Sequence, residues 1–232
     1  MKVFAISDLH LSLSTPKPMD IFGLHWEDHW GKIRQDWLSR VTEEDLVIIG
    51  GDISWAMYLE DARADLGAVM ELPGKKILLR GNHDYWWSSL NKIMAVLDDR
   101  TMILQNNALR VPGLVVAGTR GWSIVSENAD PQEVKIYHRE AQRLALSLKA
   151  AQALRQEGDR LLVQFHYPPF VDRGTPTLFT EQLDEADVDR VLFGHLHQVK
   201  PEDVPEGHVR GIEYSLVSCD YLGFSLKEIY EL

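Results

Sequence analysis

Short apolar, β-branched runs alternate along the chain with longer segments in which apolar residues recur every three or four positions. The runs that predict buried strands cover residues 3–6, 46–49, 77–79, 114–117, 161–165 and 191–193. The segments that predict helices cover residues 30–40, 58–72 and 131–157, and the last of these has Asp130 as a cap and Pro131 in its first turn. This alternation predicts an α/β fold.

The second half of the chain has a different pattern, because turn-forming residues separate short strands after position 103. Asn106-Asn107, Pro112-Gly113 and Gly223 are such residues, and we expect 212–218 and 224–230 to form a final antiparallel pair. No linker-like stretch marks a boundary, so we expect a single domain over residues 1–232. The predicted architecture is a four-layer α/β/β/α sandwich, in which two mixed sheets pack together and helices cover their outer faces.

Composition and charge limit the function classes. The 232 residues are 45% hydrophobic and 25% charged, which is typical of a soluble globular protein. The net charge is −11 and no run of Lys or Arg forms a basic stripe, so long nucleic acid is not an expected partner. No apolar stretch is long enough for a membrane span or a signal peptide. The lone Cys219 suits a buried thiol in a reducing compartment. We therefore expect a cytoplasmic protein with no membrane partner.

Polar side chains with metal-binding groups follow five of the predicted strands. The five groups are Asp8-Leu9-His10, Gly50-Gly51-Asp52, Gly81-Asn82-His83-Asp84, His166 alone, and Gly194-His195-Leu196-His197. Each group by itself is compatible with ordinary turn chemistry or a hydrogen-bonded loop. Together they would crowd imidazoles and carboxylates at the ends of strands, which is costly unless cations bind them. The combination predicts a metal centre, and the glycines allow the tight turns that it requires.

The order of these groups resembles that of the calcineurin-like metallophosphoesterase superfamily, and the resemblance spans residues 8–197. It implies the superfamily's fold of two mixed β-sheets packed face to face. It also implies that one metal ion is bound by Asp8, His10, Asp52 and His197. A second ion would be bound by Asp52, Asn82, His166 and His195, with Asp52 bridging the two.

Imidazole, carboxylate and amide ligands favour Mn, Fe or Zn over an all-oxygen calcium site. Two such ions hold a hydroxide and the phosphoryl oxygens for in-line attack, and their charge attracts a small phosphorylated substrate even to an acidic chain. The resemblance implies that His83 assists the leaving group and that Asp84 holds His83 in orientation. The alternative for His83 is a structural role in its loop.

Departures from known relatives narrow the function. Protein Ser/Thr phosphatases of the superfamily have Asp-Arg-Gly where this chain has Ile53-Ser54-Trp55, and they have Glu where it has Asp84. Lipid-A pyrophosphatase relatives have Arg where it has His83. Gly-Asn-His-Asp is closer to bacterial phosphodiesterases. The predicted function is a dinuclear metal-dependent phosphoesterase for a small phosphate ester, preferentially a diester. The alternatives are a phosphomonoesterase, a non-catalytic metal-binding scaffold and, less favoured without a basic groove, a nuclease.

Other features bear on substrate selection. Arg120 and Arg173 are candidates for binding an outer phosphate or carboxylate, and either is equally compatible with a surface ion pair. Trp55, Trp86, Trp87 and Trp122 follow the motif loops, where we favour packing over stacking on a substrate ring. The long connection at 11–29 has the length of a lid or binding loop. Within it, His25 and His29 are interpreted as polar positions at a helix start rather than as a further metal site. The oligomeric state stays open.

Overall fold

The computed structural model describes residues 1–14, 16–126, 128–172 and 174–232. The chain forms two compact units. Unit 1 consists of Met1–Ile103 and Val217–Leu232, and unit 2 consists of Leu104–Leu216. Each unit is built around one mixed β-sheet flanked by helices. The expectation of a single domain over residues 1–232 stays a prediction.

The sheet of unit 1 has the strand order β11-β1-β2-β3-β4. Its strands are β1 (Lys2–Ile6), β2 (Leu46–Ile49), β3 (Lys75–Leu79), β4 (Thr101–Leu104) and β11 (Lys227–Glu231). Strands β1, β2 and β3 are parallel, with Ile6 paired to Ile49 and Ile49 paired to Leu78. Because parallel neighbours in this register end at the same edge, the loops that follow β1, β2 and β3 begin side by side.

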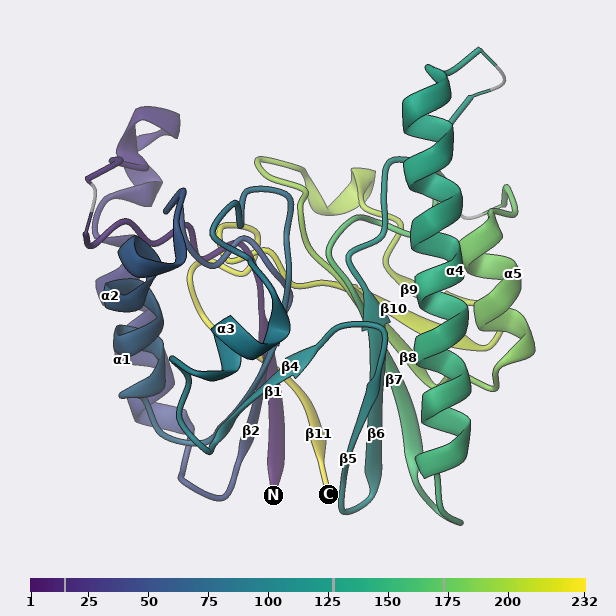
Figure 1. Ribbon diagram of the computed structural model, residues 1–232, viewed down its shortest axis with the longest axis horizontal. Helices are drawn as coiled ribbons and strands as arrows, with labels where there is room; N and C mark the ends of the chain where they lie inside the picture. The colour runs from purple at the N-terminus through teal and green to yellow at the C-terminus, as the bar shows by residue number, and fades with distance from the viewer. Residues whose placement is uncertain (15, 127, 173) are drawn as a thin grey trace. The chain divides into compact units, whose positions relative to one another are not determined.

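Helices α1 (His29–Arg40) and α2 (Leu59–Met70) lie on one face of this sheet (Figure 1). Their buried apolar positions recur at helical spacing, and they join alternate strand residues in one core. The residues that form this contact are Phe4, Ile6, Val47, Ile49, Ile33, Trp37, Leu66 and Val69. The short helices η1 (Asp20–Phe22) and η2 (Leu24–Trp26) precede α1, and α3 (Leu90–Met94) follows the loop after β3. This core fixes the sheet edge at which the motif loops of unit 1 emerge.

The sheet of unit 2 has the strand order β5-β6-β7-β8-β10-β9. Its strands are β5 (Ala108–Val111), β6 (Leu114–Thr119), β7 (Arg160–Phe165), β8 (Arg190–Phe193), β9 (Gly207–Val209) and β10 (Ile212–Leu216). Strands β6, β7, β8 and β10 run parallel, while β5 and β9 pair antiparallel at the two edges. The loops after β7 and β8, which carry the histidines, therefore start from adjacent strands.

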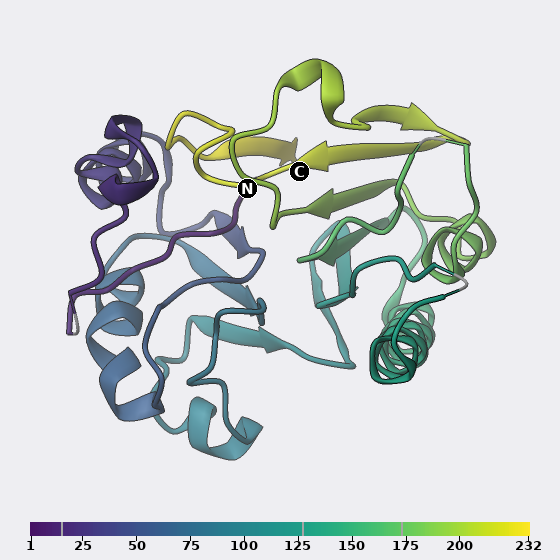
Figure 2. The ribbon, with the colours of Figure 1, turned by 90° about the horizontal axis from the view of Figure 1, so that it is seen from above.

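Helix α4 (Pro131–Leu154) packs against β5 and β6, and α5 (Leu178–Glu185) lies beside α4 (Figure 2). Asp130 caps α4 through a hydrogen bond from the Gln132 backbone N–H at 2.7 Å, as its sequence predicts. The remaining helical turn of unit 2 is η3 (Pro201–Asp203). Among the residues that the structure describes, no helix has both the length and the apolar character needed to cross a membrane.

The predicted fold class, two mixed sheets flanked by helices, is confirmed. The predicted final antiparallel pair is wrong. Strand β10 pairs with β8 and β9 in unit 2, whereas β11 pairs with β1 in unit 1. Both edges of β10 are already occupied, so the chain leaves it and bridges Ser218 to Ser7 before it reaches β11. Of the predicted turns, Pro112-Gly113 does join an antiparallel pair, β5 and β6.

Candidate functional site

The ends of β1 and β2 bring three predicted ligands together in unit 1. Asp8 places a carboxylate oxygen within 4.8 Å of an imidazole nitrogen of His10, and within the same distance of a carboxylate oxygen of Asp52. His10 Nε2 lies 3.8 Å from Asp52 Oδ2. All three side chains are at most 3% exposed. Carboxylates so close together and so well buried need a compensating cation.

The backbone at these ligands is strained. Asp8, His10 and Asp52 have φ angles of 61°, 47° and 51°, in the left-handed region that side chains other than glycine rarely adopt. His195 in unit 2 has a φ of 71°. Each such conformation costs on the order of 1 kcal/mol or more and persists where the surroundings impose it, typically at functional sites. Four of the seven predicted metal ligands carry this strain.

Asp8 is held by residues that the sequence did not identify. The hydroxyls of Ser7 and Ser218 both donate to Asp8 Oδ2, the second at 2.8 Å. The thiol of Cys219 lies 2.9 Å from the Asp8 carbonyl oxygen, and burial raises the pKa of this thiol well above its usual range. The predicted buried cysteine is confirmed. Ser218 ends the first strand of the wrongly predicted pair 212–218 and 224–230, and Cys219 follows it directly, so their approach to Asp8 was not foreseen.

Asp84 binds the backbone of two ligand-bearing loops. Its carboxylate accepts hydrogen bonds from the N–H groups of Asp52 at 2.9 Å, Ile53 at 2.9 Å, Ser54 at 3.2 Å and Gly81 at 2.8 Å. The indole of Trp86 donates a fifth bond at 2.9 Å. Burial and the neighbouring charge of Asp52 raise the pKa of Asp84 to about 6. The contacts that the structure gives Asp84 go to these two loops and to Trp86, whereas the resemblance assigned it to the His83 imidazole.

His83 is placed beside Asp52 by its own backbone, whose N–H donates to Asp52 Oδ1 at 2.7 Å. The centre of its ring lies 5.7 Å from that of His10, 4.5 Å from that of Trp55 and 6.1 Å from that of Tyr85. Asn82 precedes it in the same loop and is partly buried. His83 therefore stands next to the carboxylate cluster, where an acid or base for an incoming substrate is needed.

Gly81 allows the two loops to approach each other. A Cβ at this position would lie 2.1 Å from Asp52 Oδ1 and 2.2 Å from Asp52 N.

We expect Gly81→Ala to lower the free energy of unfolding by about 1–3 kcal/mol and to weaken metal binding, because the Asp52 backbone must move. At Gly67 in α2 an added methyl group would meet no atom within 4 Å, so Gly67→Ala is expected to stabilise the protein by about 0.5–1 kcal/mol. Urea unfolding and metal content are measured for both variants. Equal unfolding free energies and equal metal contents in the two variants would contradict the role of Gly81.

Unit 2 brings together two of its predicted ligands. His166 is fully buried at the end of β7, and its ring centre lies 5.2 Å from that of His195. Tyr167 packs on His195 with ring centres 4.1 Å apart. The Gly194 N–H donates to the His166 carbonyl at 3.0 Å, which joins the loops after β7 and β8. His197 follows in the second loop and is partly buried.

Of the two arginines predicted to bind substrate, the structure describes Arg120. The guanidinium of Arg120 lies 3.5 Å from the buried Glu140 carboxylate and 4.6 Å from the centre of the Trp122 ring. Its carbonyl accepts from the N–H of His166 at 3.1 Å. Arg120 therefore forms an ion pair with a buried partner instead of the surface ion pair that was the alternative, and its substrate role stays a prediction. Arg173 lies outside the described residues.

Two of the four motif tryptophans and one of the two extra histidines serve packing. Trp86 and Trp87 are buried against each other, with ring centres 5.1 Å apart. His29 contacts the Leu9 carbonyl oxygen at 3.0 Å and packs against Trp26. Trp55 differs, because it is only partly buried and its ring stacks on His10 at 4.7 Å between centres. The favoured packing role fits Trp86 and Trp87, while Trp55 lies at the site.

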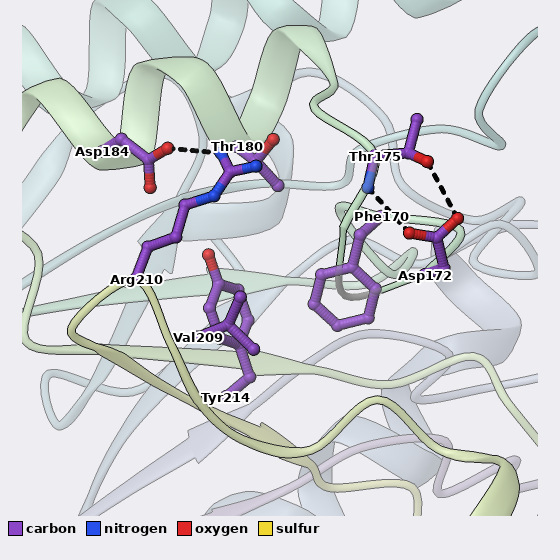
Figure 3. A pocket seen from close by; sticks show the side chains of 8 residues that line it. All are labelled: Phe170, Asp172, Thr175, Thr180, Asp184, Val209, Arg210 and Tyr214. Carbon is purple, nitrogen blue, oxygen red and sulfur yellow. Dashed lines mark hydrogen bonds and ion pairs between the residues drawn. The ribbon is translucent and has the colours of Figure 1, made fainter.

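A small cavity in unit 2 is separate from these ligands. Its volume is about 10 Å³, which is room for one water molecule and too small for a phosphate ester. Arg210 and Asp184 close one side of it with an ion pair of 2.7 Å (Figure 3). Its lining consists of Phe170, Asp172, Thr175, Thr180, Asp184, Val209, Arg210 and Tyr214. No predicted ligand is among these residues.

The residues present fit transition-metal binding. Unit 1 combines two buried carboxylates with an imidazole, and unit 2 by itself brings together the imidazoles of His166 and His195. Mixed nitrogen and oxygen donors of this kind suit Mn, Fe or Zn. The close pair of Asp8 and Asp52 carboxylates, both at most 1% exposed, is the feature that most requires a cation.

Comparisons with known proteins agree with this chemistry. Residues 1–199 match the family model of the calcineurin-like phosphoesterases. No curated protein matches the chain in sequence.

Solved structures with a similar fold include TT1561 of Thermus thermophilus, with 13% identity and a TM-score of 0.61 over 98% of this chain and 97% of that one. The phosphopantetheinyl hydrolase PptH of Mycobacterium tuberculosis has 14% identity and a TM-score of 0.57 over 100% and 96% of the two chains. AQ665 of Aquifex aeolicus, a protein of unknown function, has 17% identity and a TM-score of 0.52 over 98% and 95%. These likenesses concern the fold, and the family match adds the chemistry. The chain belongs to the calcineurin-like phosphoesterase family and is a metal-dependent hydrolase of phosphoester bonds.

Proposed function

We propose that this hydrolase cleaves a small phosphodiester with the help of two bound metal ions. The observation that carries the proposal is the buried carboxylate pair of Asp8 and Asp52 beside His10, in a chain whose residues 1–199 match the phosphoesterase family. A pair of bound ions would activate water as the nucleophile and neutralise charge on the phosphoryl group. Mn, Fe and Zn are the candidates, since the donors are imidazole, carboxylate and amide oxygen.

The ligand sets follow from the family motif. Asp8, His10, Asp52 and His197 would hold one ion, and Asp52, Asn82, His166 and His195 would hold the other. Within unit 1, Ser7 and Ser218 support this assignment because they orient the Asp8 carboxylate. Residues that orient a ligand in this way tune its affinity for the metal.

His83 would donate a proton to the leaving oxygen. Its backbone bond to Asp52 Oδ1 keeps its imidazole beside the carboxylate cluster, and the indole of Trp55 contacts its ring. Asp84 would position the site without touching the substrate, because its five hydrogen bonds hold the loops that carry Asp52 and His83. Arg120 and Arg173 remain proposals for binding an outer group of the substrate.

A diester is favoured over the alternatives on the motif Gly81-Asn82-His83-Asp84, which is closer to bacterial phosphodiesterases than to protein phosphatases. A phosphomonoesterase is the nearest rival, because an open two-metal site accepts both kinds of ester. A non-catalytic scaffold is less favoured, since every ligand position and His83 are filled. The acidic chain argues against long nucleic acid as a partner. The proposed substrate is a small phosphorylated molecule, attracted by the bound cations, and the proposed location is the cytoplasm with no membrane partner.

Hydrolysis of two chromogenic esters tests the proposal. The protein is stripped with a chelator, its metal content is measured, and bis(4-nitrophenyl) phosphate and 4-nitrophenyl phosphate are assayed with Mn, Fe(II) or Zn restored. We expect diester hydrolysis that the chelator removes and a metal restores, with two ions bound per chain. Hydrolysis of the monoester alone would support the phosphomonoesterase, and two bound ions without turnover of either ester would support the scaffold.

A further inference from the structure

The ammonium group of Lys17 lies against the indole of Trp55, the side chain that contacts two histidines of the predicted site. Its Nζ lies 3.2 Å from the centre of the Trp55 ring. The same indole stacks on His10 and contacts His83, with ring centres 4.7 and 4.5 Å away. The ammonium group and the His83 imidazole therefore contact one shared side chain. Lys17 comes from the 11–29 connection, for which the sequence predicted a lid or binding role.

The connection that carries Lys17 is fastened to the body of unit 1. The Leu13 N–H donates to Asp65 Oδ1 at 2.8 Å, and the Ser14 hydroxyl donates to the Asp61 carbonyl at 2.7 Å. The indole N–H of Trp55 points to Met19 Sδ at 3.2 Å, on the other side of Lys17 in the sequence. These contacts hold the segment at both ends, so the position of Lys17 beside Trp55 is built into the fold.

The ammonium group is exposed and, among the residues that the structure describes, no oxygen accepts a hydrogen bond from it. Lys32 in the same unit differs, since its Nζ lies 5.1 Å from the Phe224 ring and also donates to the His25 carbonyl at 2.8 Å. A cation–π contact of an exposed lysine contributes only about 0.5–1 kcal/mol and leaves its three N–H donors available for a ligand. In a chain of net charge −11, such a cation at a phosphoesterase site favours an anionic group.

We propose that Lys17 binds a second anionic group of the substrate, so that this enzyme prefers a phosphate ester that carries a further phosphate or carboxylate beyond the bond it cleaves. The inference rests on the proposed function of the same site. With the scissile phosphorus beside His83, the second group would pass the Trp55 indole to reach the ammonium. Trp55 would then serve as the surface that keeps Lys17 in place and directs its charge toward the substrate.

Matched esters measure this preference. Three 4-nitrophenyl alkyl phosphodiesters share one alkyl arm, which ends in a carboxylate, a methyl ester or a trimethylammonium group. We expect wild-type kcat/KM to decrease in that order. Lys17→Met should reduce the ratio of carboxylate to methyl ester about tenfold, the size expected for one charge-assisted hydrogen bond. Lys17→Arg should restore most of the ratio, and Lys32→Met, which removes a similar cation from the same unit, should keep the wild-type ratio.

Equilibrium binding separates failure of this inference from failure of the proposed function. Calorimetric titration of the metal-loaded protein compares 3-phosphonopropionate with ethylphosphonate, neither of which is hydrolysed. We expect tighter binding of 3-phosphonopropionate in the wild type, reduced about tenfold by Lys17→Met and unchanged by Lys32→Met. A preference that survives Lys17→Met, or that Lys32→Met removes equally, would overturn the role of Lys17. Absence of diester hydrolysis with normal phosphonate discrimination would instead reject only the diesterase function.

Discussion

Replacing His83 by alanine is expected to reduce kcat for bis(4-nitrophenyl) phosphate by about 10²- to 10⁴-fold, the usual contribution of a positioned acid or base. The imidazole stands beside the carboxylate cluster, since the His83 N–H binds Asp52 Oδ1 at 2.7 Å. Because that bond comes from the backbone, the loop and its ligands should survive removal of the side chain. Metal content should stay at two ions per chain, which distinguishes a proton donor from a ligand.

His138→Ala is the matched control for this variant, because His138 is an exposed residue of α4 and has no predicted role in the site. Its kcat should equal that of the wild type. A substrate with a better leaving group, such as a 2,4-dinitrophenyl ester, should lose less activity in His83→Ala, since it needs less protonation. Equal losses for both esters, or a loss of bound metal, would show that His83 has a structural role in its loop instead.

The strand-end chemistry was predictable because its signals are local. Five of the six predicted buried strands were followed by a polar metal-binding group, and parallel strands in register end together, as Ile6, Ile49 and Leu78 do. The register explains why Asp8 and Asp52 lie close to each other although 44 positions separate them in the sequence. Helix caps such as Asp130 are equally local and were predicted correctly.

The residues that the sequence did not reveal act over long sequence distances. Ser218 donates to Asp8 from the opposite end of the chain, and nothing near Ser218 in the sequence marks it as part of a metal site. The wrong hairpin had a similar origin, because both strands had correct periodicity while their partners, β8 and β1, depended on the arrangement of the whole sheet. Lys17 was missed because a lone lysine in a loop becomes informative only when its contact with Trp55 is seen.

Replacing Asp84 by alanine is expected to lower the free energy of unfolding by about 3–5 kcal/mol, because five buried donors lose their acceptor together. The consequence for function follows from where those donors lie. Three belong to the loop after β2, which carries Asp52, and one is the N–H of Gly81, in the loop after β3 that carries Asn82 and His83. Without the carboxylate the two loops are free to separate, so metal affinity should fall about 10- to 100-fold.

Asp45→Ala provides the control that separates stability from function. Asp45 is also buried in unit 1, and its carboxylate accepts from the N–H groups of Lys2 at 2.6 Å and Thr42 at 2.8 Å and from the Thr42 hydroxyl at 2.8 Å. It holds the opposite ends of the strands, so its loss should lower the free energy of unfolding but leave metal affinity of the folded protein unchanged. Urea unfolding and metal titration of both variants, at a temperature where each is folded, make the comparison. If Asp45→Ala weakened metal binding as much as Asp84→Ala, general destabilisation would account for the effect; a selective loss in Asp84→Ala identifies its carboxylate as the group that positions the ligand loops.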